Sequence, residues 1–542
     1  MEYRVGNCFV SRTPLLSIED YGCAFNEDDS QHMASNLLNK FRDPFLLETL
    51  AVTSYELYEE LLKVKNMESH HYSEHFLSTL IKYYIRLTTR PTPYGLFAGV
   101  SLGNFGDKTD MCITDAACHK KNARVDMEWL YSVVKKIESN TEIRKKLLVK
   151  SNNYTFVSGN RLEKPTRTFL QINGVSNEIG TSIRYTKQVQ TVLEYANDLI
   201  SYPDLLALIE KNNPTVPTEI LELFLAQLLD NEFLITELRP PLFNVDPLTY
   251  VINILSKIKD CEEVEDYLNG LVIIKEKINS YNHTSIGEGL TLFDEIINIM
   301  KPLHESSNYL QVDMKVLTNN NELDISIKKE LEDFMNAILS ITPKNDFSDE
   351  YISYVDSFLE KYGVDAQVPI LELLDANSGL GTPVYYQHDT AIYNTVKHPK
   401  SIQERRLEEI IKRKSIDAIK CDMHTIELTD EDIKYISNGR AGEIKKLQEY
   451  GKQVLPSFEL FVLVHSYVPK EKKEKHFLSI APAVASSGVG RSFGRFRYMF
   501  SSSETECLNK QFDDIKKSFP EDIMVEIAEI PEKGRLSNIA MN

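Results

Sequence analysis

The segment of residues 86–99 constrains this chain most, because it fixes where a helix ends and what conformation follows. The preceding apolar residues recur at helical spacing and predict an amphipathic helix over residues 73–89, with a stripe made of Phe76, Leu77, Leu80, Ile81, Tyr84 and Ile85. Pro91 disfavours the helical conformation at Arg90, so the helix should end there. A second proline and Gly95 then predict a tight turn.

Two arginines lie at this helix end. Arg86 and Arg90 are four residues apart, so they share one face, opposite the apolar stripe, and Thr92 follows in the turn. Two guanidiniums on a stiff element can bind a phosphate or a carboxylate with bidentate geometry. The alternative is a pair of solvated arginines on the outer face of a surface helix, and periodicity alone favours that alternative.

The amino-acid sequence of this segment resembles a known signature. Arg-(x)3-Arg-Pro-Thr-Pro-Tyr-Gly-Leu-Phe-Ala-Gly-Val, at residues 86–100, is similar to a motif in the N-terminal module of the class I lantibiotic dehydratase family. The resemblance implies an enzyme that takes an activated amino acid, usually glutamate, from its tRNA and places it on Ser or Thr hydroxyls of a ribosomally made peptide. In the family a separate C-terminal module then eliminates the glutamate, and a related branch extends peptide C-termini instead.

Shorter motifs extend the resemblance along the chain. Residues 9–14 resemble the family's opening strand, residues 124–129 its Arg-x-Asp-x-x-Trp element, and residues 494–496 its Gly-Arg-Phe element, while the predicted strand 309–314 carries an aspartate in a similar setting. The catalytic residues that the resemblance implies are Arg12, Arg86, Arg90, Thr92, Asp126, Asp313 and Arg495.

The resemblance assigns roles to these residues. The arginines would hold the terminal phosphates of the tRNA and the substrate carboxylate, and Thr92 would add a hydrogen bond. Asp126 or Asp313 would position the amino group or assist proton transfer. For both aspartates an ordinary alternative is open, because Asp126 is also well placed to cap a helix and a lone aspartate at a strand end is often a turn residue.

The net charge of −19 excludes a protein that coats nucleic acid, because phosphate binding requires cations. One basic groove on an acidic protein is still compatible with tRNA. The tRNA-binding residues we expect are Arg491, Arg497, Arg405, Arg406, Lys412 and Arg413. Arg491 and Arg497 alternate with Phe493, Phe496 and Tyr498, a pairing suited to a tRNA acceptor end, and the alternative for this segment is an arginine-rich strand edge. For the other four residues the alternative is a solvated helix face.

We expect an α+β, multi-domain fold of mixed sheets and helices. Residues 1–150 form the start of the transfer module, with helical patterns at 33–65 and 73–89. Residues 241–345 are mostly helical. Residues 346–542 continue the module as an α/β region that contains the Gly-Arg-Phe element and a predicted buried strand at 458–464.

Residues 151–240 read as a small separate domain with a winged helix-turn-helix pattern. Short strands precede three helices, at about 188–196, 203–211 and 217–230, and a strand closes the domain. The last helix is acidic on its outer face (Glu219, Glu222, Gln227 and Asp230), so DNA readout is rejected. In the family this element recognises precursor peptides by adding their leader segment as an extra strand. A plain structural domain is the alternative.

Neither a metal nor a bound cofactor is expected. The seven cysteines form no C-x-x-C pair, and His71 and His75 lack the carboxylate of a His-Glu-x-x-His motif. A Walker loop and a nucleophile elbow are also missing from the sequence, so the co-substrate we expect is an aminoacyl-tRNA, with glutamyl-tRNA first. No apolar run approaches 18 residues and the start lacks a signal-peptide pattern, so we expect a cytoplasmic protein.

Compared with the family, the chain ends soon after Gly-Arg-Leu-Ser-Asn at residues 534–538. We therefore expect it to lack the elimination module and to act with a separate elimination protein, or to be a fragment. The expected partners are the precursor peptide and tRNA, and the oligomeric state is open, a homodimer included. Two other functions stay open: a non-catalytic scaffold that binds the precursor, and a ligase that extends peptide C-termini.

Overall fold

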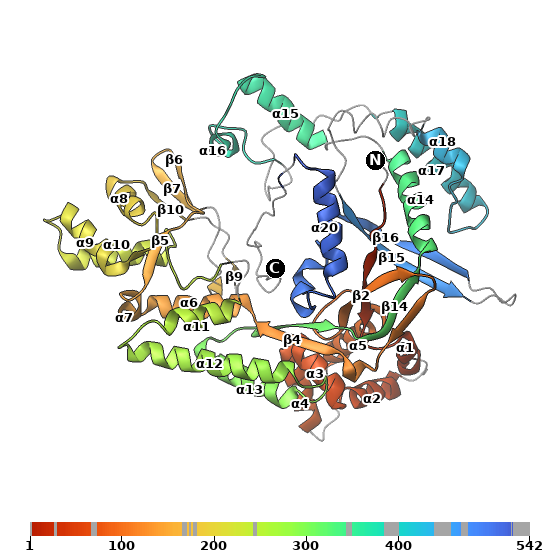
Figure 1. Cartoon of the computed structure of the whole chain (residues 1–542), viewed down its shortest axis with the longest axis horizontal. Helices are drawn as coiled ribbons and strands as arrows, with labels where there is room; N and C mark the ends of the chain where they lie inside the picture. Colours follow the sequence, from red (N-terminus) through yellow and green to blue (C-terminus); the bar gives the residue numbers. More distant parts are fainter. Residues whose placement is uncertain are drawn as a thin grey trace. The chain divides into compact units, whose positions relative to one another are not determined.

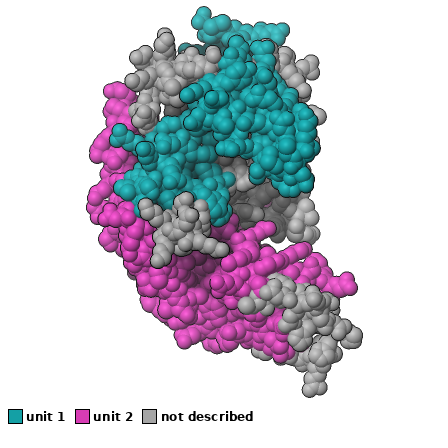
Figure 2. All heavy atoms as spheres, turned by 90° about the vertical axis from the view of Figure 1, so that its right-hand side faces the viewer, with its two compact units in different colours: residues 1–6, 324–489 teal, residues 7–323, 490–542 magenta. Residues whose placement is uncertain are grey.

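The computed structural model describes residues 3–25, 30–66, 73–164, 171–172, 175–176, 181–241, 246–342, 349–383, 400, 402–437, 457–467, 475–521 and 523 (Figure 1). The chain divides into two compact units, which Figure 2 colours teal and magenta. Unit 1 consists of Met1–Gly6 and Asp324–Val489, and unit 2 of Asn7–Leu323 and Gly490–Asn542. All seven predicted catalytic residues belong to unit 2. The mixture of helices and several sheets confirms the predicted α+β class.

A six-stranded sheet forms the centre of unit 2. Its strands follow the order β3-β14-β2-β13-β4, and β1 pairs with β2 in addition. Strand β13 comes from far along the chain, yet it lies between β2, to which it is parallel, and β4, to which it is antiparallel. The bounds of the strands are β1 Cys8–Pro14, β2 Ala98–Gly106, β3 Asp110–Ile113, β4 Lys120–Val125, β13 Leu310–Lys315 and β14 Thr318–Asp324.

The register of this sheet separates polar from apolar side chains. Val100 pairs with Arg12 on β1 and with Lys315 on β13, and Gln311 pairs with Arg124 on β4. Because side chains alternate along a strand and paired residues share a face, Arg12, Asp313 and Arg124 lie on one face. The opposite face presents the buried apolar side chains Ala123, Val125, Val312 and Met314.

Helices cover the apolar face and complete the main core. The largest buried side chains of this core include Phe41, Leu80, Tyr84, Trp129 and Tyr281. In Figure 1, α3, α12 and α13 lie below β4. The helices of this layer are α1 Ile18–Phe25, α2 Ser30–Lys40, α3 Pro44–Thr53, α4 Tyr55–Asn66, α5 Glu74–Thr89, α6 Met127–Ser139, α11 Pro247–Leu255, α12 Glu262–Asn282 and α13 Leu290–Leu303.

The helical pattern predicted at 33–65 is confirmed, and it is divided into three helices. The carboxylate of Asp43 accepts a hydrogen bond from the backbone N–H of Phe45, and Pro44 takes the first helical position of α3. Ser54 adopts an extended conformation and ends that helix. Both breaks come from local capping chemistry, which an apolar period spanning the whole stretch conceals.

The predicted helix end at Arg90 is confirmed. Helix α5 stops at Thr89, and Arg90 has φ −107° and ψ 112°, in the extended region that a following proline favours. Gly95 has φ +54°, and a Cβ there would lie 2.8 Å from Oγ1 of Thr53. Only glycine fits this turn without strain, so the turn that follows the two arginines has a fixed shape.

The polar face of the sheet is covered by the segment that returns after residue 490. This segment contains the 3-10 helix η4, Gly494–Met499, and the helix α20, Glu506–Ser518. Phe493, Phe496 and Leu508 form a small buried core with Val100 of β2. Figure 1 shows α20 above the sheet, on the side away from α12 and α13. The polar face of the sheet is therefore covered by a segment that is distant in sequence from the strands beneath it.

Residues 148–236 build a smaller core of their own within unit 2. Strands β5 (Leu148–Ser151), β11 (Ile200–Ser201) and β12 (Leu234–Thr236) form one three-stranded sheet, and β6 (Phe156–Ser158), β7 (Arg161–Lys164) and β10 (Thr181–Arg184) form another. The other elements are α7 Thr141–Arg144, β8 Gln171–Ile172, β9 Val175–Ser176, α8 Lys187–Tyr195, α9 Tyr202–Asn212 and α10 Thr218–Asp230.

The three predicted helices and the closing strand of this small domain are confirmed, and their apolar side chains, among them Leu205, Leu225 and Phe233, are fully buried. Part of the region of short strands predicted before these helices, residues 165–170, lies outside the described residues. The winged-helix assignment and the four-part division of the chain stay predictions.

Unit 1 combines helices with one two-stranded sheet. Strands β15 and β16 pair antiparallel, and Leu463 on β15 is 54% exposed, so the strand predicted at 458–464 exists but is not buried. The elements are α14 Ser326–Ile341, α15 Asp349–Tyr362, α16 Ile370–Leu374, α17 Ile402–Lys420, α18 Asp430–Ser437, β15 Phe458–Tyr467 and β16 Lys475–Ser487. Among the described residues of both units, no helix is long and apolar enough to span a membrane.

A buried ion pair fixes the helical layer to the apolar face of the sheet. Lys121 of β4 pairs with Glu48 of α3, and both side chains are fully buried. The same carboxylate accepts hydrogen bonds from the Tyr281 hydroxyl at 2.8 Å and from the backbone N–H groups of Gly287 and Gly289 at 2.7 and 2.9 Å. Burial lowers the pKa of Lys121, and the adjacent Glu48 opposes that shift. The carboxylate thus connects β4, α3 and α12.

We predict that Glu48→Ala destabilises unit 2 by about 3–5 kcal/mol, because it leaves the Lys121 ammonium buried without its partner. Trp129 is the sole tryptophan and is fully buried in this unit, so urea unfolding can be followed by its fluorescence. Glu56→Ala, at an exposed position on α4, is the matched control. Equal unfolding midpoints for the two variants would contradict the proposed role of the ion pair.

Candidate functional site

The guanidinium of Arg86 is held at the end of α5 by an aromatic ring. Its Cζ lies 4.2 Å from the centre of the Tyr94 ring, in a cation–π contact. Its Nε is buried and has no hydrogen-bond partner among the described residues. The side chain is half-buried, so the alternative of a freely solvated arginine is wrong for Arg86. A buried donor without a protein partner is a candidate for binding an anionic ligand.

Arg90 and Thr92 follow at the same helix end and are exposed. Arg90 ends the helix, and its backbone N–H donates to the carbonyl of Arg86 at 3.2 Å. Arg86, Arg90 and Thr92 therefore lie within seven residues at one helix end, and the side chains of Arg90 and Thr92 reach solvent. We call these three residues the α5 cluster.

Arg495 connects the α5 cluster to the polar face of the sheet. Its Nη2 donates to the carbonyl of Pro93 at 3.3 Å, in the turn that follows α5. The guanidinium lies 4.3 Å from the ring of Phe496, which is buried beneath it. Burial lowers the pKa of Arg495, while the carboxylate of Asp313 opposes this shift. Through Arg495, η4 therefore contacts the turn that follows the α5 cluster.

Asp313 is buried on the polar face, where Nε2 of Gln311 lies 3.5 Å from its Oδ1 and two further side chains approach its Oδ2. The hydroxyl of Tyr498 donates to its Oδ2 at 2.8 Å, and Nη2 of Arg124 lies 3.9 Å from the same oxygen. The Arg124 guanidinium also lies 5.6 Å from the Tyr498 ring. Burial, followed by the charge of Asp313, raises the pKa of Tyr498, so this hydroxyl stays protonated and can donate. We call Asp313, Arg124 and Tyr498 the aspartate cluster.

The remaining predicted catalytic residues differ in their surroundings. Arg12 is half-buried on the polar face, opposite Val100 of β2. Asp126 is the N-cap of α6, and its carboxylate accepts hydrogen bonds from the backbone N–H groups of Glu128 and Trp129 at 2.9 and 3.4 Å. Burial raises the pKa of Asp126, and the two cap bonds oppose that shift. The capping alternative is therefore realised for Asp126, and Asp313 is the better candidate for a functional carboxylate.

The predicted tRNA-binding residues fall into two sets. Arg491 and Arg497 are exposed in unit 2, near the polar face. Arg405, Arg406, Lys412 and Arg413 lie on α17 in unit 1, and several of them have intramolecular partners: Lys412 pairs with Glu408, Arg413 with Asp432, and Arg406 donates to the carbonyl of Tyr435. The two sets therefore belong to different units, and their role in tRNA binding stays a prediction.

The expectation that aromatic residues near Arg495 stack tRNA bases is wrong. Phe493 and Phe496 are 3% and 1% exposed and pack in the small core beneath η4. Tyr498 directs its hydroxyl to Asp313. The segment is a 3-10 helix rather than a strand edge, so its aromatic residues face the sheet and its arginines are displayed separately.

Sequence reasoning missed the pairing of Tyr498 with Asp313. The two residues are 185 positions apart, and no local pattern joins them. The sequence analysis noted Arg124 only as the first residue of the Arg-x-Asp-x-x-Trp element and gave it no role. The available signal was the polar character of a strand segment, Gln311 to Lys315, in which alternate residues would otherwise be expected to face an apolar core.

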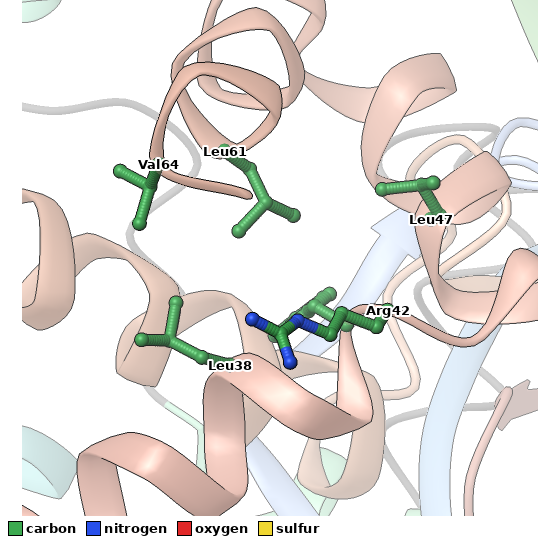
Figure 3. A pocket seen from close by; sticks show the side chains of 6 residues that line it. Leu38, Arg42, Leu47, Leu61 and Val64 are labelled. Carbon is green, nitrogen blue, oxygen red and sulfur yellow. The ribbon is translucent and has the colours of Figure 1, made fainter. Parts of the chain in front are cut away.

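An apolar hollow of unit 2 lies away from these clusters in the sequence. Figure 3 shows it between α2, α3 and α4, lined by Leu38, Phe41, Arg42, Leu47, Leu61 and Val64. Arg42 is one of the lining side chains labelled in Figure 3, and its Nη1 donates to the side-chain oxygen of Asn39 at 3.0 Å. None of the predicted site residues lines the hollow. Within the described part of the chain, no group of three or more His, Cys, Asp or Glu residues is arranged to hold a metal; His71 lies outside that part.

A family model described as lantibiotic dehydratase, N terminus, matches residues 42–542. The chain belongs to this family. Epidermin biosynthesis protein EpiB of Staphylococcus epidermidis is 26% identical over 537 residues, covering 99% of this chain and 51% of the relative. Subtilin biosynthesis protein SpaB of Bacillus subtilis is 27% identical over 549 residues, covering 100% of this chain and 50% of the relative. The chain thus spans about half the length of these relatives.

Solved structures agree with the fold. The tRNA-dependent lantibiotic dehydratase MibB from Microbispora sp. 107891 aligns with a TM-score of 0.74 and 24% identity, covering 94% of this chain and 47% of that protein. The glutamylation domain of TbtB, from thiomuracin biosynthesis, aligns with a TM-score of 0.52 and 15% identity, covering 93% of this chain and 58% of that one. At these identities the likeness shows the fold.

We predict that Tyr498→Phe destabilises unit 2 by about 1.5–3 kcal/mol, because the buried carboxylate of Asp313 loses a hydrogen bond while the ring beside Arg124 remains. Urea unfolding followed through Trp129 measures the change. Tyr154→Phe removes a hydroxyl from a ring that is 48% exposed and is the matched control. If Tyr498→Phe unfolds at the same urea concentration as the control, Tyr498 does not hold Asp313.

Proposed function

We propose that unit 2 transfers an aminoacyl group, with glutamyl first, from tRNA to Ser or Thr hydroxyls of a ribosomally made precursor peptide. The observation that carries the proposal is that η4 joins the two clusters, because its Arg495 donates to the carbonyl of Pro93 in the turn after α5 and its Tyr498 donates to Asp313. It joins cationic groups suited to phosphate with a buried, oriented carboxylate. Membership of the lantibiotic dehydratase family and the printed descriptions of MibB and TbtB support this choice of reaction.

The proposed chemistry is a transesterification. The hydroxyl oxygen of the peptide forms a bond to the ester carbonyl carbon, and the bond from that carbon to the ribose oxygen breaks. The proton of the attacking hydroxyl ends on the ribose oxygen, so no oxidant or second energy source is needed. Such a reaction depends mainly on positioning and on stabilising the oxyanion, and both are tasks that fixed guanidiniums can perform.

Each cluster has a role in this proposal. Arg86 and Arg90 bind phosphates at the acceptor end of the tRNA, with Thr92 as a further donor. Arg495 and Arg12 hold the substrate carboxylate or the developing oxyanion. Asp313 binds the amino group of the transferred residue, since it is an oriented carboxylate in a buried setting. Residues 151–240 bind the leader segment of the precursor as an added strand, for which β6 and β10 are the outer strands of their sheet.

We predict that Arg86→Ala and Arg90→Ala each reduce transfer at least about 100-fold, because each removes a preorganised cation from the reacting region. The measurement is intact-mass analysis of a precursor peptide incubated with the protein, glutamate, glutamyl-tRNA synthetase and tRNA. Arg42→Ala, an exposed arginine of the same unit, is the control. Normal transfer by either cluster variant would contradict the assignment, provided that Trp129 fluorescence shows an intact unit 2.

The same assay separates the competing functions. Mass additions that disappear after RNase treatment and that fragment as Ser or Thr esters support transfer, whereas additions at the peptide C-terminus would identify a ligase. The alternative of a non-catalytic scaffold predicts that a labelled leader peptide binds, as measured by fluorescence anisotropy, while no mass is added under any condition. Under our proposal, Arg86→Ala still binds the leader and loses only transfer.

A further inference from the structure

Tyr94 presents a large aromatic ring to solvent beside the α5 cluster. The side chain is 42% exposed, although it lies in the middle of a segment whose neighbours Leu96 and Phe97 are fully buried. The Arg86 guanidinium covers part of the ring at 4.2 Å from its centre. A ring left in contact with water at a cationic site can bind a ligand through its remaining surface.

The position of this ring is fixed from several sides. The Phe97 ring approaches it edge-on, with 6.2 Å between the centroids and 74° between the planes. The backbone carbonyl of Tyr94 accepts a hydrogen bond from the N–H of Phe97 at 3.0 Å, and Gly95 sets the turn between them. The hydroxyl lies 3.5 Å from the carbonyl of Thr53.

The chemistry of the surroundings favours a nucleotide over an apolar ligand. A base stacked on the ring would lie next to Arg86, Arg90 and Thr92, all of which can bind the adjoining phosphate. Recognition of single-stranded nucleic acid commonly combines aromatic stacking with such cations, and every base has a π-face that can stack. The aromatic rings of η4, which sequence reasoning suggested for this task, are buried or bound to Asp313.

We propose that Tyr94 stacks an unpaired base at the acceptor end of the tRNA, while the α5 cluster binds the adjoining phosphate. The inference rests on the proposed function and adds to it a specific nucleobase-binding residue. In this proposal the Tyr94 ring has two roles: it orients the Arg86 guanidinium, and it stacks the base next to that guanidinium.

The test uses tRNA that carries 2-aminopurine at its 3′ terminal base, a fluorophore that is quenched on stacking. We expect the full chain to quench it on binding, Tyr94→Phe and Tyr94→Trp to keep the quench, and Tyr94→Leu to lose it. In the transfer assay, Tyr94→Leu should raise KM for the aminoacyl-tRNA roughly tenfold, with little change in KM for the peptide. Tyr21→Leu, an exposed ring of the same unit, is the control.

Three outcomes would decide against the inference, and each has a distinct meaning. Full quenching and normal KM in Tyr94→Leu would show that the base lies elsewhere. An increase in KM for the peptide alone would show that the ring holds the precursor. Absence of any tRNA binding by the unaltered protein would instead overturn the proposed function, and the inference would fail with it. Recovery of the quench by the Phe and Trp variants separates stacking from a general disturbance of Arg86.

Discussion

The insertion of β13 between β2 and β4 is the constraint on which the rest of unit 2 depends. Its register brings Asp313 beside Arg124 and places Lys315 in line with Val100 and Arg12. A shift of one residue would turn Asp313 into the helical core and expose Val312 and Met314 on the polar face. The apolar residues of β13 therefore define the register, and the register positions the carboxylate of Asp313.

Buried charge occurs on both faces of this sheet, with different consequences. Beneath the sheet, the Glu48 carboxylate is satisfied by an ammonium, a hydroxyl and two backbone N–H groups, and it connects structural elements. Above the sheet, Asp313 is held by Tyr498 and Arg124, and Arg495, on the same 3-10 helix as Tyr498, donates to the turn that follows the α5 cluster. One network is closed to solvent, while the other leads to groups that a ligand can reach, which is the arrangement a binding site requires.

Local features of the fold were predictable, and features that depend on distant pairing were not. The end of α5 at Arg90, the capping of α6 by Asp126 and the strand at 310–315 follow from proline chemistry, a side-chain cap and alternation. The break of residues 33–65 into three helices was missed, because the apolar period continues across the caps. The burial of Phe493 and Phe496 was also missed, since their partner Val100 lies on a strand almost four hundred positions earlier.

The candidate site shows the same division. The sequence singled out the arginines through a specific motif, and their role in a site stays a prediction. It could not show that Arg495 reaches the carbonyl of Pro93 or that Tyr498 holds Asp313, because these contacts exist only after the segment beyond residue 490 returns to cover the sheet. Tertiary structure thus converts separate motif residues into a connected site.

The most direct test of this account is a crystal structure of the protein with a non-hydrolysable analogue in which glutamate is joined by an amide bond to the 3′-terminal nucleotide of tRNA. The account predicts the phosphate against Arg86 and Arg90, and the amino group of the glutamate at Asp313. Density for the analogue at the basic face of α17, or at any position remote from both clusters, would contradict the claim that these clusters form one aminoacyl-transfer site.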